Sequence, residues 1–380
     1  MKKVLFIVPK LATGGTNSSL DSLYPLLKDK FEVSVFSLSH HPVNHSYSFN
    51  EVLLPKDYFL SLIYANFSDQ KGINKVLAFF VKILRTLMKG LRMDLGKMRS
   101  RHVVSRLEKE TSYDYIVGYQ EGNATHFAAL FKNPNKIAWI HVDYNKYLPS
   151  SLTEEPLYSS FGKIVSVSEY TTYVFCQRYP SLAVKTQAIN NIIDSSRIIN
   201  LSKQAINDSR FNTQEFVILS VGRFAKVKRF SEIPRIASVL KEKGVKFKWY
   251  ILGPLYQESE VETFQSNLCK YNVHDCVEWL GGKTNPYPYF AAANLYVCLS
   301  ESEACPMVFK EAQIMHLPIV STDFPSAYEF IDDSVGIISN MNEIPDAIIA
   351  MKNRIEQGFI VNYSNKDALL ILDKICNLFR

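Results

Sequence analysis

Short runs of β-branched and aromatic residues alternate with longer helical patterns along most of this 380-residue chain. Such alternation is typical of parallel β-sheets whose faces are covered by helices. Five strands are predicted in the first half: Lys3–Val8, Glu32–Leu38, Tyr113–Tyr119, Lys136–His141 and Lys163–Ser168. Six are predicted in the second half: Glu215–Gly222, Phe247–Gly253, Cys276–Gly281, Leu295–Ser300, Pro318–Thr322 and Val335–Ser339. The sequence therefore predicts an α/β protein.

A polar segment without a clear hydrophobic period, Asp194–Gln214, separates the two series of strands and is the predicted linker. A chain of this length is too long for one ordinary domain and suits two. We therefore expect two Rossmann-like domains with parallel sheets that face a central cleft. The predicted bounds are 1–195 and 196–360, with 361–380 as a C-terminal helix that crosses back to the first domain.

Composition places the chain among globular proteins, because 47% of its residues are apolar and 21% are charged. The apolar run near the N-terminus, Val4–Pro9, is too short for a signal peptide and predicts a buried first strand. No apolar run approaches the 18 or so residues of a membrane-spanning helix. Six cysteines without C-x-x-C pairs favour free thiols in a reducing compartment. We expect a cytoplasmic protein.

Loops beyond the carboxyl ends of parallel strands are where ligands bind in such folds. After the first strand, "KLATGGTNSSL" contains Gly14 and Gly15, which let the backbone approach a ligand closely. The pattern is not G-x-G-x-x-G, which weakens a dinucleotide interpretation, and a glycine turn with a purely steric role is an equal alternative.

A second loop, "GRFAKVKRF", places Arg223 and Lys228 five residues apart just beyond a predicted strand. One planar guanidinium and one flexible ammonium suit a diphosphate. The alternative is a solvated basic loop.

The third loop, "CLSESEACPMVFKEAQ", carries Glu303 and Glu311 eight residues apart, with Pro306 between them. In a single helix the two carboxylates would point about 80° apart, which is a poor shared face. The proline instead indicates a strand, a polar loop with Glu303, and a helix that Pro306 opens and that carries Glu311. Its first N–H groups would attract phosphate. The alternative is a surface helix with two solvated glutamates.

Together these residues resemble the GT-B glycosyltransferases of family 4, which are retaining enzymes that use nucleotide-diphosphate sugars. The resemblance spans nearly the whole chain and is strongest from Phe216 to Phe330. It rests on the paired glutamates, the Gly222-Arg223…Lys228 loop, the glycine loop, His141 in "WIHVDY", and the runs "VSVSEY" and "NIID". The sequence departs from the family pattern at three positions where glycine is common: Ala304, His316 and Arg229.

The resemblance implies a role for each site residue. Glu303 and His141 would be catalytic, although a lone histidine after a strand can also be an ordinary hydrogen-bonded cap. Gly14 and Glu121 would lie on the acceptor side. The expected donor-binding residues are Gly15, Arg223, Lys228, Gly253, Cys305, Pro306, Met307, Val308 and Glu311.

The implied reaction is retaining transfer of a sugar from a UDP-sugar to a lipid-linked or glycan acceptor, in the synthesis of a surface polysaccharide or glycoconjugate. The first domain would bind the acceptor and the second the donor. The sequence contains no D-x-D motif, so neither a metal nor another cofactor is expected. Two alternatives are a GT-B sugar-nucleotide epimerase and a noncatalytic partner of another transferase. The retained acidic and basic site residues argue against both.

A basic amphipathic helix is predicted from Lys75 to Met93. Its cations, at intervals of 7, 3, 4 and 3, share one face, and apolar residues cover the rest: Lys75, Lys82, Arg85, Lys89 and Arg92. Such a helix can lie on an anionic membrane, here the inner face of the plasma membrane. The alternative is a core-packed helix with a solvated basic stripe. The net charge of +6 favours an anionic surface, and the absence of a nucleic-acid-binding motif argues against nucleic acid.

Overall fold

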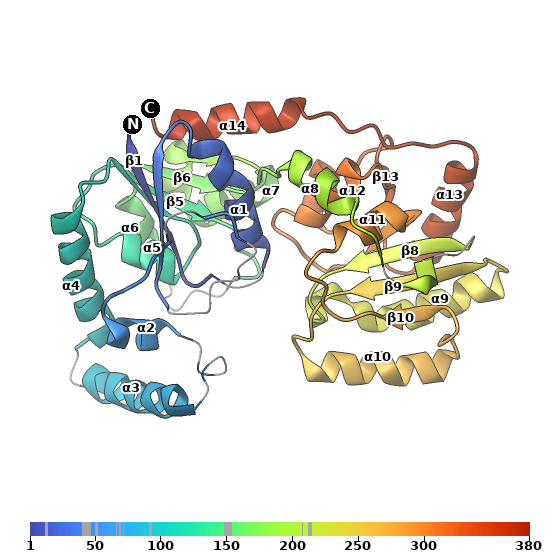
Figure 1. The fold of residues 1–380 in the computed structure, drawn as a ribbon, viewed down its shortest axis with the longest axis horizontal. Helices are drawn as coiled ribbons and strands as arrows, with labels where there is room; N and C mark the ends of the chain where they lie inside the picture. The colour runs from blue at the N-terminus through green and yellow to red at the C-terminus, as the bar shows by residue number, and fades with distance from the viewer. Residues whose placement is uncertain are drawn as a thin grey trace. The chain divides into compact units, whose positions relative to one another are not determined.

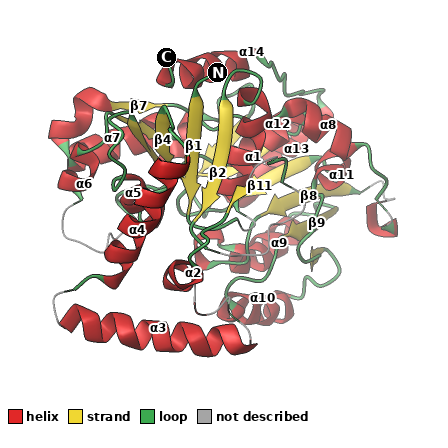
Figure 2. Ribbon diagram, turned by 60° about the vertical axis from the view of Figure 1, so that its left-hand side comes forward, coloured by secondary structure: helices red, strands yellow, loops and turns green. Residues whose placement is uncertain are grey.

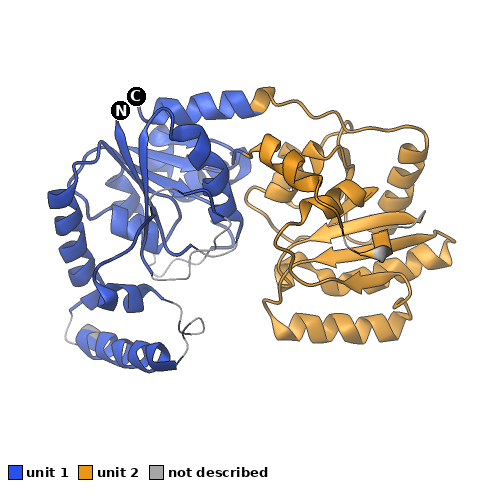
Figure 3. Cartoon of the chain, in the orientation of Figure 1, with its two compact units in different colours: residues 1–192, 368–380 blue, residues 193–367 orange. Residues whose placement is uncertain are grey.

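The structure is a computed structural model. It describes residues 1–11, 14–39, 47–49, 52–65, 67, 70, 72–90, 93–147, 154–206, 208–211 and 215–380. The chain divides into two compact units (Figure 3). The first comprises residues 1–192 and 368–380, and the second comprises residues 193–367.

The first unit is built on a parallel sheet of seven strands in the order β3-β2-β1-β4-β5-β6-β7. Figure 1 labels β1, β5 and β6 of this sheet. Its strands are β1 (Lys3–Val8), β2 (Glu32–Ser37), β3 (Val52–Leu53), β4 (Tyr115–Gly118), β5 (Lys136–Ile140), β6 (Lys163–Ser166) and β7 (Thr186–Ala188). The central strand β1 is buried from Val4 to Val8, as its unbroken apolar run predicts.

Helices of the first unit cover the sheet and extend beyond it. They are α1 (Gly15–Leu27), α2 (Tyr58–Tyr64), α3 (Gly72–Gly90), α4 (Leu95–Glu110), α5 (Asn123–Ala128), α6 (Glu155–Ser159), α7 (Glu169–Arg178) and α14 (Lys366–Leu378). The predicted amphipathic helix is α3, which starts at Gly72 and ends at Gly90 rather than at Met93. It contacts α2 and α4 and lies away from the sheet (Figure 2). Across the described residues, no helix is both long enough and apolar enough to cross a membrane.

The second unit contains a parallel sheet of six strands in the order β10-β9-β8-β11-β12-β13. Its strands are β8 (Phe216–Val221), β9 (Phe247–Leu252), β10 (Val277–Trp279), β11 (Leu295–Cys298), β12 (Ile319–Thr322) and β13 (Gly336–Ser339). Its helices are α8 (Ser195–Ser202), α9 (Ile233–Glu242), α10 (Glu258–Tyr271), α11 (Tyr287–Ala292), α12 (Met307–Ile314) and α13 (Ile344–Glu356). Strand order changes direction beside β8, so the loops after β8 and β11 lie at the switch point of the sheet.

All eleven predicted strands are present, and the α/β class with two parallel sheets is confirmed. The sequence missed β3 and β7 because they contain only two and three residues, and "TQA" in β7 carries no apolar alternation. Most predicted strands extend a residue or more too far, because their ends include residues of the following turn.

The predicted linker Asp194–Gln214 is wrong in part, because it contains the helix α8. The Asp194 side chain caps this helix by accepting a hydrogen bond from the Arg197 N–H at 2.9 Å. Ile198 is buried against Ile193 and Ile314. Few apolar residues occur in this helix of eight residues, so the hydrophobic period does not indicate it.

The C-terminal residues are anchored to the first unit. Phe379 is fully buried and makes edge contacts with Phe6 and Phe31. The Lys2 ammonium donates to the carbonyl oxygens of Phe379 and Arg380, at 3.2 and 2.9 Å. Phe379, directly after α14, therefore contributes to the hydrophobic core around Phe6 and Phe31.

Candidate active site

The basic loop after β8 lies beside the loop after β11. Gly222 and Arg223 follow the strand, and a short 3₁₀ turn, Lys226–Lys228, follows them. The Glu301 N–H donates to the Val227 carbonyl at 2.8 Å, which ties the two loops together. The Arg223 guanidinium lies 4.4 Å from the centre of the Tyr256 ring, a distance at which a cation is attracted to the ring face.

Lys228 and Glu303 form an ion pair between these loops. The Lys228 ammonium and the Ser300 hydroxyl both donate to Oε1 of Glu303, the latter at 2.8 Å. The two charged side chains are only 18% and 19% exposed. Burial alone would lower the pKa of Lys228, but the charge and hydrogen bond of Glu303, together with Cys298, outweigh burial, so that the pKa is raised. Lys228 is therefore a stable cation inside the site.

Glu311 is held differently. It is the fifth residue of α12, and its Oε1 accepts a hydrogen bond from the Tyr287 hydroxyl of α11 at 3.2 Å. Burial raises the pKa of Glu311 to about 7, although the Tyr287 hydrogen bond and the Lys228 charge act in the opposite direction. Its carboxyl group therefore changes charge near neutral pH.

The two glutamates approach a common centre. After burial itself and the nearby Cys298, both raise the pKa of the buried Tyr296 phenol, and Lys228 acts electrostatically on Glu311 as well as on Glu303. Arg223 also acts on Lys228, whose pKa it lowers. The second unit thus gathers the two acids and two bases that the sequence singled out.

The N-terminus of α12 faces the same loop. Pro306 is the N-cap, with an extended backbone, and the helix begins at Met307, one residue later than predicted. Pro306 has no N–H, so Cys305, Met307 and Val308 are the residues of this run that can donate to an anion. The first turn holds no acidic side chain. Its local field therefore favours a negatively charged ligand.

Two of the three departures from the family pattern have a direct backbone explanation. Arg229 and His316 adopt left-handed conformations with φ of 52° and 56°, a region that glycine occupies at least cost. His316 ends α12, where its N–H donates to Gln313 O at 3.0 Å and the Leu317 N–H donates to Ala312 O at 2.9 Å. Its ring also meets the Val361 carbonyl, at 2.8 Å. Ala304 does not have a positive φ, so alanine is unstrained there.

Gly253 is required by close backbone packing. A Cβ at this position would lie 1.6 Å from the Gly222 carbonyl oxygen. Its N–H donates to Gly281 O at 3.0 Å, and its carbonyl accepts from the Trp279 indole at 2.9 Å. Gly253 therefore allows the loops after β8 and β9 to come together, and its own polar groups are already engaged.

The first unit joins His141 to Glu121. Glu121 follows β4, and its Oε2 accepts the backbone N–H of His141 at 2.9 Å. Burial raises the pKa of Glu121 and lowers the pKa of His141 to about 3. The His141 ring is therefore neutral at pH 7. Its Nε2 is buried without a hydrogen-bond partner among the described residues, so this histidine is not a satisfied cap.

Aromatic residues that the sequence did not single out surround His141. Its ring centre lies 4.7 Å from that of Tyr119 and is stacked with Trp139 at 6.5 Å. The Ser19 hydroxyl bridges the Tyr119 hydroxyl and Asn191 Oδ1, at 2.9 and 2.8 Å. The alternation of β5 offered one signal, because Trp139 and His141 are two residues apart and share a face.

The glycine loop before α1 has no packing reason to contain glycine. A Cβ placed on Gly14 or Gly15 meets no atom within 4 Å, and neither residue has a φ in the left-handed region. The neighbouring Ala12 and Thr13 lie outside the described residues. The purely steric explanation for these glycines therefore lacks support within the unit.

In the second unit the sequence did not single out Tyr287, Ser300 or Tyr256. Ser300 directly precedes the acidic loop, so its position offered a weak signal. Tyr287 is 24 residues from Glu311, and Tyr256 is 33 residues from Arg223, and no spacing rule connects such pairs.

Comparison with known proteins agrees with this geometry. Residues 202–366 match the family described as glycosyl transferases group 1. A Campylobacter jejuni N-acetylgalactosamine-N,N'-diacetylbacillosaminyl-diphospho-undecaprenol 4-alpha-N-acetylgalactosaminyltransferase is 24% identical over 96% of this chain and 94% of its own length. An O-antigen biosynthesis glycosyltransferase of Escherichia coli, WbnH, is 22% identical over 90% of this chain and 88% of its own. The superposition on the crystal structure of Anabaena HepE with UDP and glucose covers 99% of both chains, with a TM-score of 0.66 and 17% identity.

The two parallel sheets and the likeness to this solved structure show a GT-B fold. Residues 202–366 are similar to the group 1 glycosyl transferases, and the chain as a whole is a transferase rather than an epimerase or a noncatalytic partner.

Proposed function

We propose that this protein is a retaining glycosyltransferase of family 4 that transfers a sugar from a UDP-sugar to a lipid-linked or glycan acceptor in surface polysaccharide or glycoconjugate synthesis. The main support for donor binding is the ion pair of Lys228 and Glu303. It lies beside Arg223, Glu311 and a helix N-terminus whose first turn has no acidic side chain. This combination of fixed cations and N–H groups suits a diphosphate.

Donor binding would exchange partners within the site. Without a ligand, Lys228 neutralises Glu303. A diphosphate would compete for this ammonium, with Arg223 and the N–H groups of Cys305, Met307 and Val308 as further donors. Glu303 would then be released to accept hydrogen bonds from the donor sugar and to stabilise positive charge at its anomeric carbon. Glu311 would accept the two ribose hydroxyls, and Gly15 would lie close to the donor.

Cleavage of the sugar–phosphate bond leaves negative charge on the departing UDP. We propose that Arg223, Lys228 and the α12 N–H groups stabilise this charge, so that turnover needs neither a divalent metal nor another cofactor. We also propose that the reaction retains configuration. The acceptor would attack from the face that the diphosphate leaves.

On the acceptor side, the buried and neutral His141 can accept or donate one hydrogen bond through Nε2, which supports a role in orienting a sugar hydroxyl. Glu121 fixes its backbone. Gly14 would let an acceptor approach α1.

Two observations support the proposed acceptor class. The Campylobacter relative is named for a diphospho-undecaprenol-linked saccharide. In addition, Lys75, Lys82 and Arg85 of α3 are exposed cations that suit an anionic membrane surface. Arg92 lies outside the described residues, as does the Lys89 side chain. We therefore propose a cytoplasmic enzyme that works peripherally at the inner face of the plasma membrane.

The proposal is tested by incubating the protein with a panel of UDP-sugars and GDP-sugars and measuring thermal stabilisation, because a ligand that binds the native state raises the unfolding temperature. The stabilising donor is then supplied with a polyprenyl-diphosphate saccharide, and the product's anomeric configuration is determined by NMR. We expect stabilisation by a UDP-sugar and a retained configuration. An inverted product, or no stabilisation by any UDP-sugar, would contradict the proposal.

A further inference from the structure

The apolar side chains of α3 are exposed. Phe80 is 61% exposed, Leu87 63% and Ile73 75%. The full set of exposed large apolar residues on this helix is Ile73, Val76, Leu77, Phe79, Phe80, Ile83, Leu84 and Leu87. The alternative of a core-packed helix with a solvated basic stripe is therefore wrong, because the large apolar side chains are exposed together with the cations.

The remaining side of α3 attaches the helix to the first unit. Among its described side chains, only Ala78 and Val81 are buried, where they pack against Leu62 and Ile63 of α2. Near them, the Arg85 guanidinium donates to the Ile63 carbonyl at 3.1 Å. Ala78, Val81 and the Arg85 guanidinium thus contact α2, whereas the large apolar residues named above are exposed.

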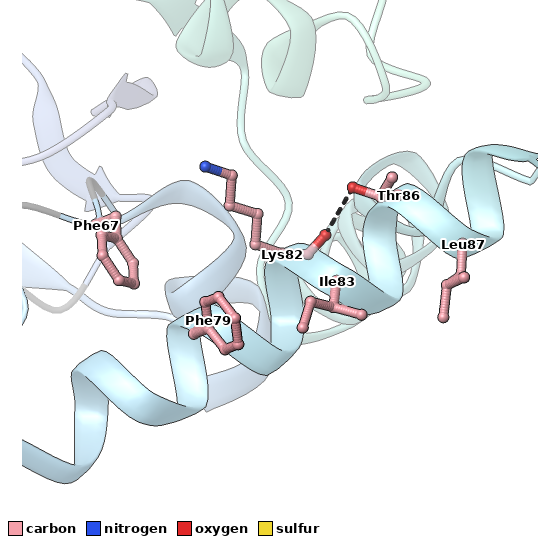
Figure 4. Close-up of a pocket in the computed structure, with 6 residues that line it drawn as sticks. All are labelled: Phe67, Phe79, Lys82, Ile83, Thr86 and Leu87. Carbon is pink, nitrogen blue, oxygen red and sulfur yellow. Dashed lines mark hydrogen bonds between the residues drawn. The ribbon is translucent and has the colours of Figure 1, made fainter.

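A shallow pocket of about 430 Å³ runs along this stripe. It is lined by Phe67, Phe79, Lys82, Ile83, Thr86 and Leu87. In Figure 4, Phe79, Ile83 and Leu87 project from one side of α3, whereas the Lys82 ammonium extends from the other. The helix α3 therefore presents apolar side chains on one side and a positive charge on another.

The charge around α3 restricts what can cover the stripe. Residues 72–106 contain nine lysines and arginines and a single acidic residue, Asp94. This segment therefore carries a net charge of +8, more than the +6 of the whole chain, and the rest of the chain is slightly acidic. A second copy of this helix would bring like charges together, whereas an anionic lipid surface would neutralise them.

We propose that α3 lies in the interface of an anionic bilayer with its apolar stripe inserted at the level of the acyl chains. Phe79, Phe80, Ile83 and Leu87 enter the membrane, and Lys75 and Lys82 remain among the headgroups. This goes beyond an electrostatic contact through the basic face, since it makes the apolar side the principal contact. The inference rests on the proposed function for its purpose, which is to bring the site to a lipid-linked acceptor.

The test is co-sedimentation with vesicles of phosphatidylcholine and phosphatidylglycerol, at low and at high sodium chloride. The apolar variant is Phe80→Gln with Ile83→Gln and Leu87→Gln, and the basic variant is Lys75→Gln with Lys82→Gln. Glutamine keeps good helix propensity. The matched control replaces exposed apolar residues elsewhere in the first unit: Val184→Gln with Leu369→Gln and Leu370→Gln.

We expect the apolar variant to lose about tenfold or more of its vesicle partition at both salt concentrations, since its contact does not depend on charge. The basic variant should lose binding mainly at low salt, and the control should bind like the wild type. Equal binding of the apolar variant and the wild type would overturn the inference. So would a dimer in light scattering that the apolar substitutions abolish, because the stripe would then bind a second copy.

Failure of this inference is distinguishable from failure of the proposed function. UDP binding is measured by calorimetry on the same variants, all of which are substituted away from the donor site. Vesicle binding that depends on the stripe in a protein that binds no nucleotide would leave the inference intact and refute the donor assignment. Nucleotide binding without stripe-dependent vesicle binding would do the reverse.

Discussion

Glu303 and Glu311 lie eight residues apart and are neutralised in different ways. Glu303 forms an ion pair with a lysine. Glu311 is buried beside the Tyr287 phenol, and its pKa of about 7 means that it is partly protonated at neutral pH. The proposed roles differ accordingly. Glu303 becomes available when a diphosphate binds Lys228, and Glu311 is ready for the ribose only when it is ionised.

The affinity for a UDP-sugar should therefore depend on pH through Glu311. Because a carboxylate accepts two hydroxyl hydrogen bonds and the pKa of Glu311 is about 7, affinity should rise about tenfold between pH 6 and pH 8. A UDP-sugar is used in the calorimetric titration because its diphosphate does not titrate in this range. Glu311→Gln should remove the dependence.

Tyr287→Phe should move the same profile to higher pH, since the Tyr287 hydroxyl helps to keep the pKa of Glu311 from rising further. A change in affinity that is equal at every pH would indicate a purely structural role for Tyr287. An unshifted wild-type profile in Tyr287→Phe would contradict the assignment.

The same pKa predicts a stability difference. The folded protein binds the Glu311 proton more tightly than the unfolded chain does. The contribution of this proton to folding stability is therefore complete at low pH and is lost as pH rises through about 7. Glu311→Gln should therefore be more stable than the wild type by about 1 to 3 kcal/mol at pH 8, and about equally stable at pH 5. Urea unfolding at both pH values measures this difference. Equal stabilities of the two proteins at pH 8 would show that ionised Glu311 does not destabilise the folded state.

At the residue scale, the sequence indicated the charged residues of the site better than the residues that contact them. Pro306 between two acids was enough to indicate a loop and a helix, because proline restricts where a helix can start. Tyr287 was not predictable, because its contact with Glu311 depends on how α11 packs beside α12. The left-handed backbone conformations of Arg229 and His316 were also not predictable, since glycine is the residue that usually indicates such a conformation.

At the scale of elements, two glycines serve different purposes, which substitution by alanine should separate. Gly253→Ala places a Cβ against the Gly222 carbonyl and should destabilise the protein by more than about 4 kcal/mol. Gly15→Ala meets no atom within 4 Å and should change stability by less than about 0.5 kcal/mol, while weakening UDP-sugar binding. Thermal unfolding and calorimetry measure both effects. A Gly15→Ala protein with unchanged donor affinity would remove the glycine loop from the donor site.

Helix α3 shows what periodicity can and cannot predict. The spacing of its basic and apolar residues indicated an amphipathic helix, and the helix is present. Which face is buried depends on α2, a seven-residue helix that was not predicted. Since α2 covers only a narrow side of α3, the apolar stripe remains outside.

At the scale of the whole molecule, the alternation of strands and helices was sufficient for the fold class, because parallel strands require crossover helices. The division of the chain was harder to predict. Residues 368–380 belong with the first unit, to which the sequence already assigned a C-terminal helix. The predicted linker Asp194–Gln214, in contrast, contains α8, whose Ile198 packs against the distant Ile314. Such long-range packing leaves little trace in local composition.

Catalysis by protein cations alone predicts turnover without added metal. Activity in EDTA should equal activity in Mg²⁺ or Mn²⁺ to within about twofold, because Arg223 and Lys228 supply the charge that a metal would otherwise provide. The assay measures release of UDP in the presence of acceptor. Complete loss in EDTA with recovery on adding Mg²⁺ or Mn²⁺ would contradict this account of the leaving group.

The central claim is that Arg223 and Glu311 bind a nucleotide diphosphate within one site of the second unit. Calorimetric titration of UDP into Arg223→Ala and Glu311→Ala tests it most directly. Arg354→Ala is the matched control, because Arg354 lies 4.2 Å from the Phe359 ring centre, much as Arg223 lies against Tyr256. We predict that both site variants remain folded and bind UDP about tenfold or more weakly than the wild type, whereas the control binds normally. Wild-type affinity in both folded site variants would contradict the claim.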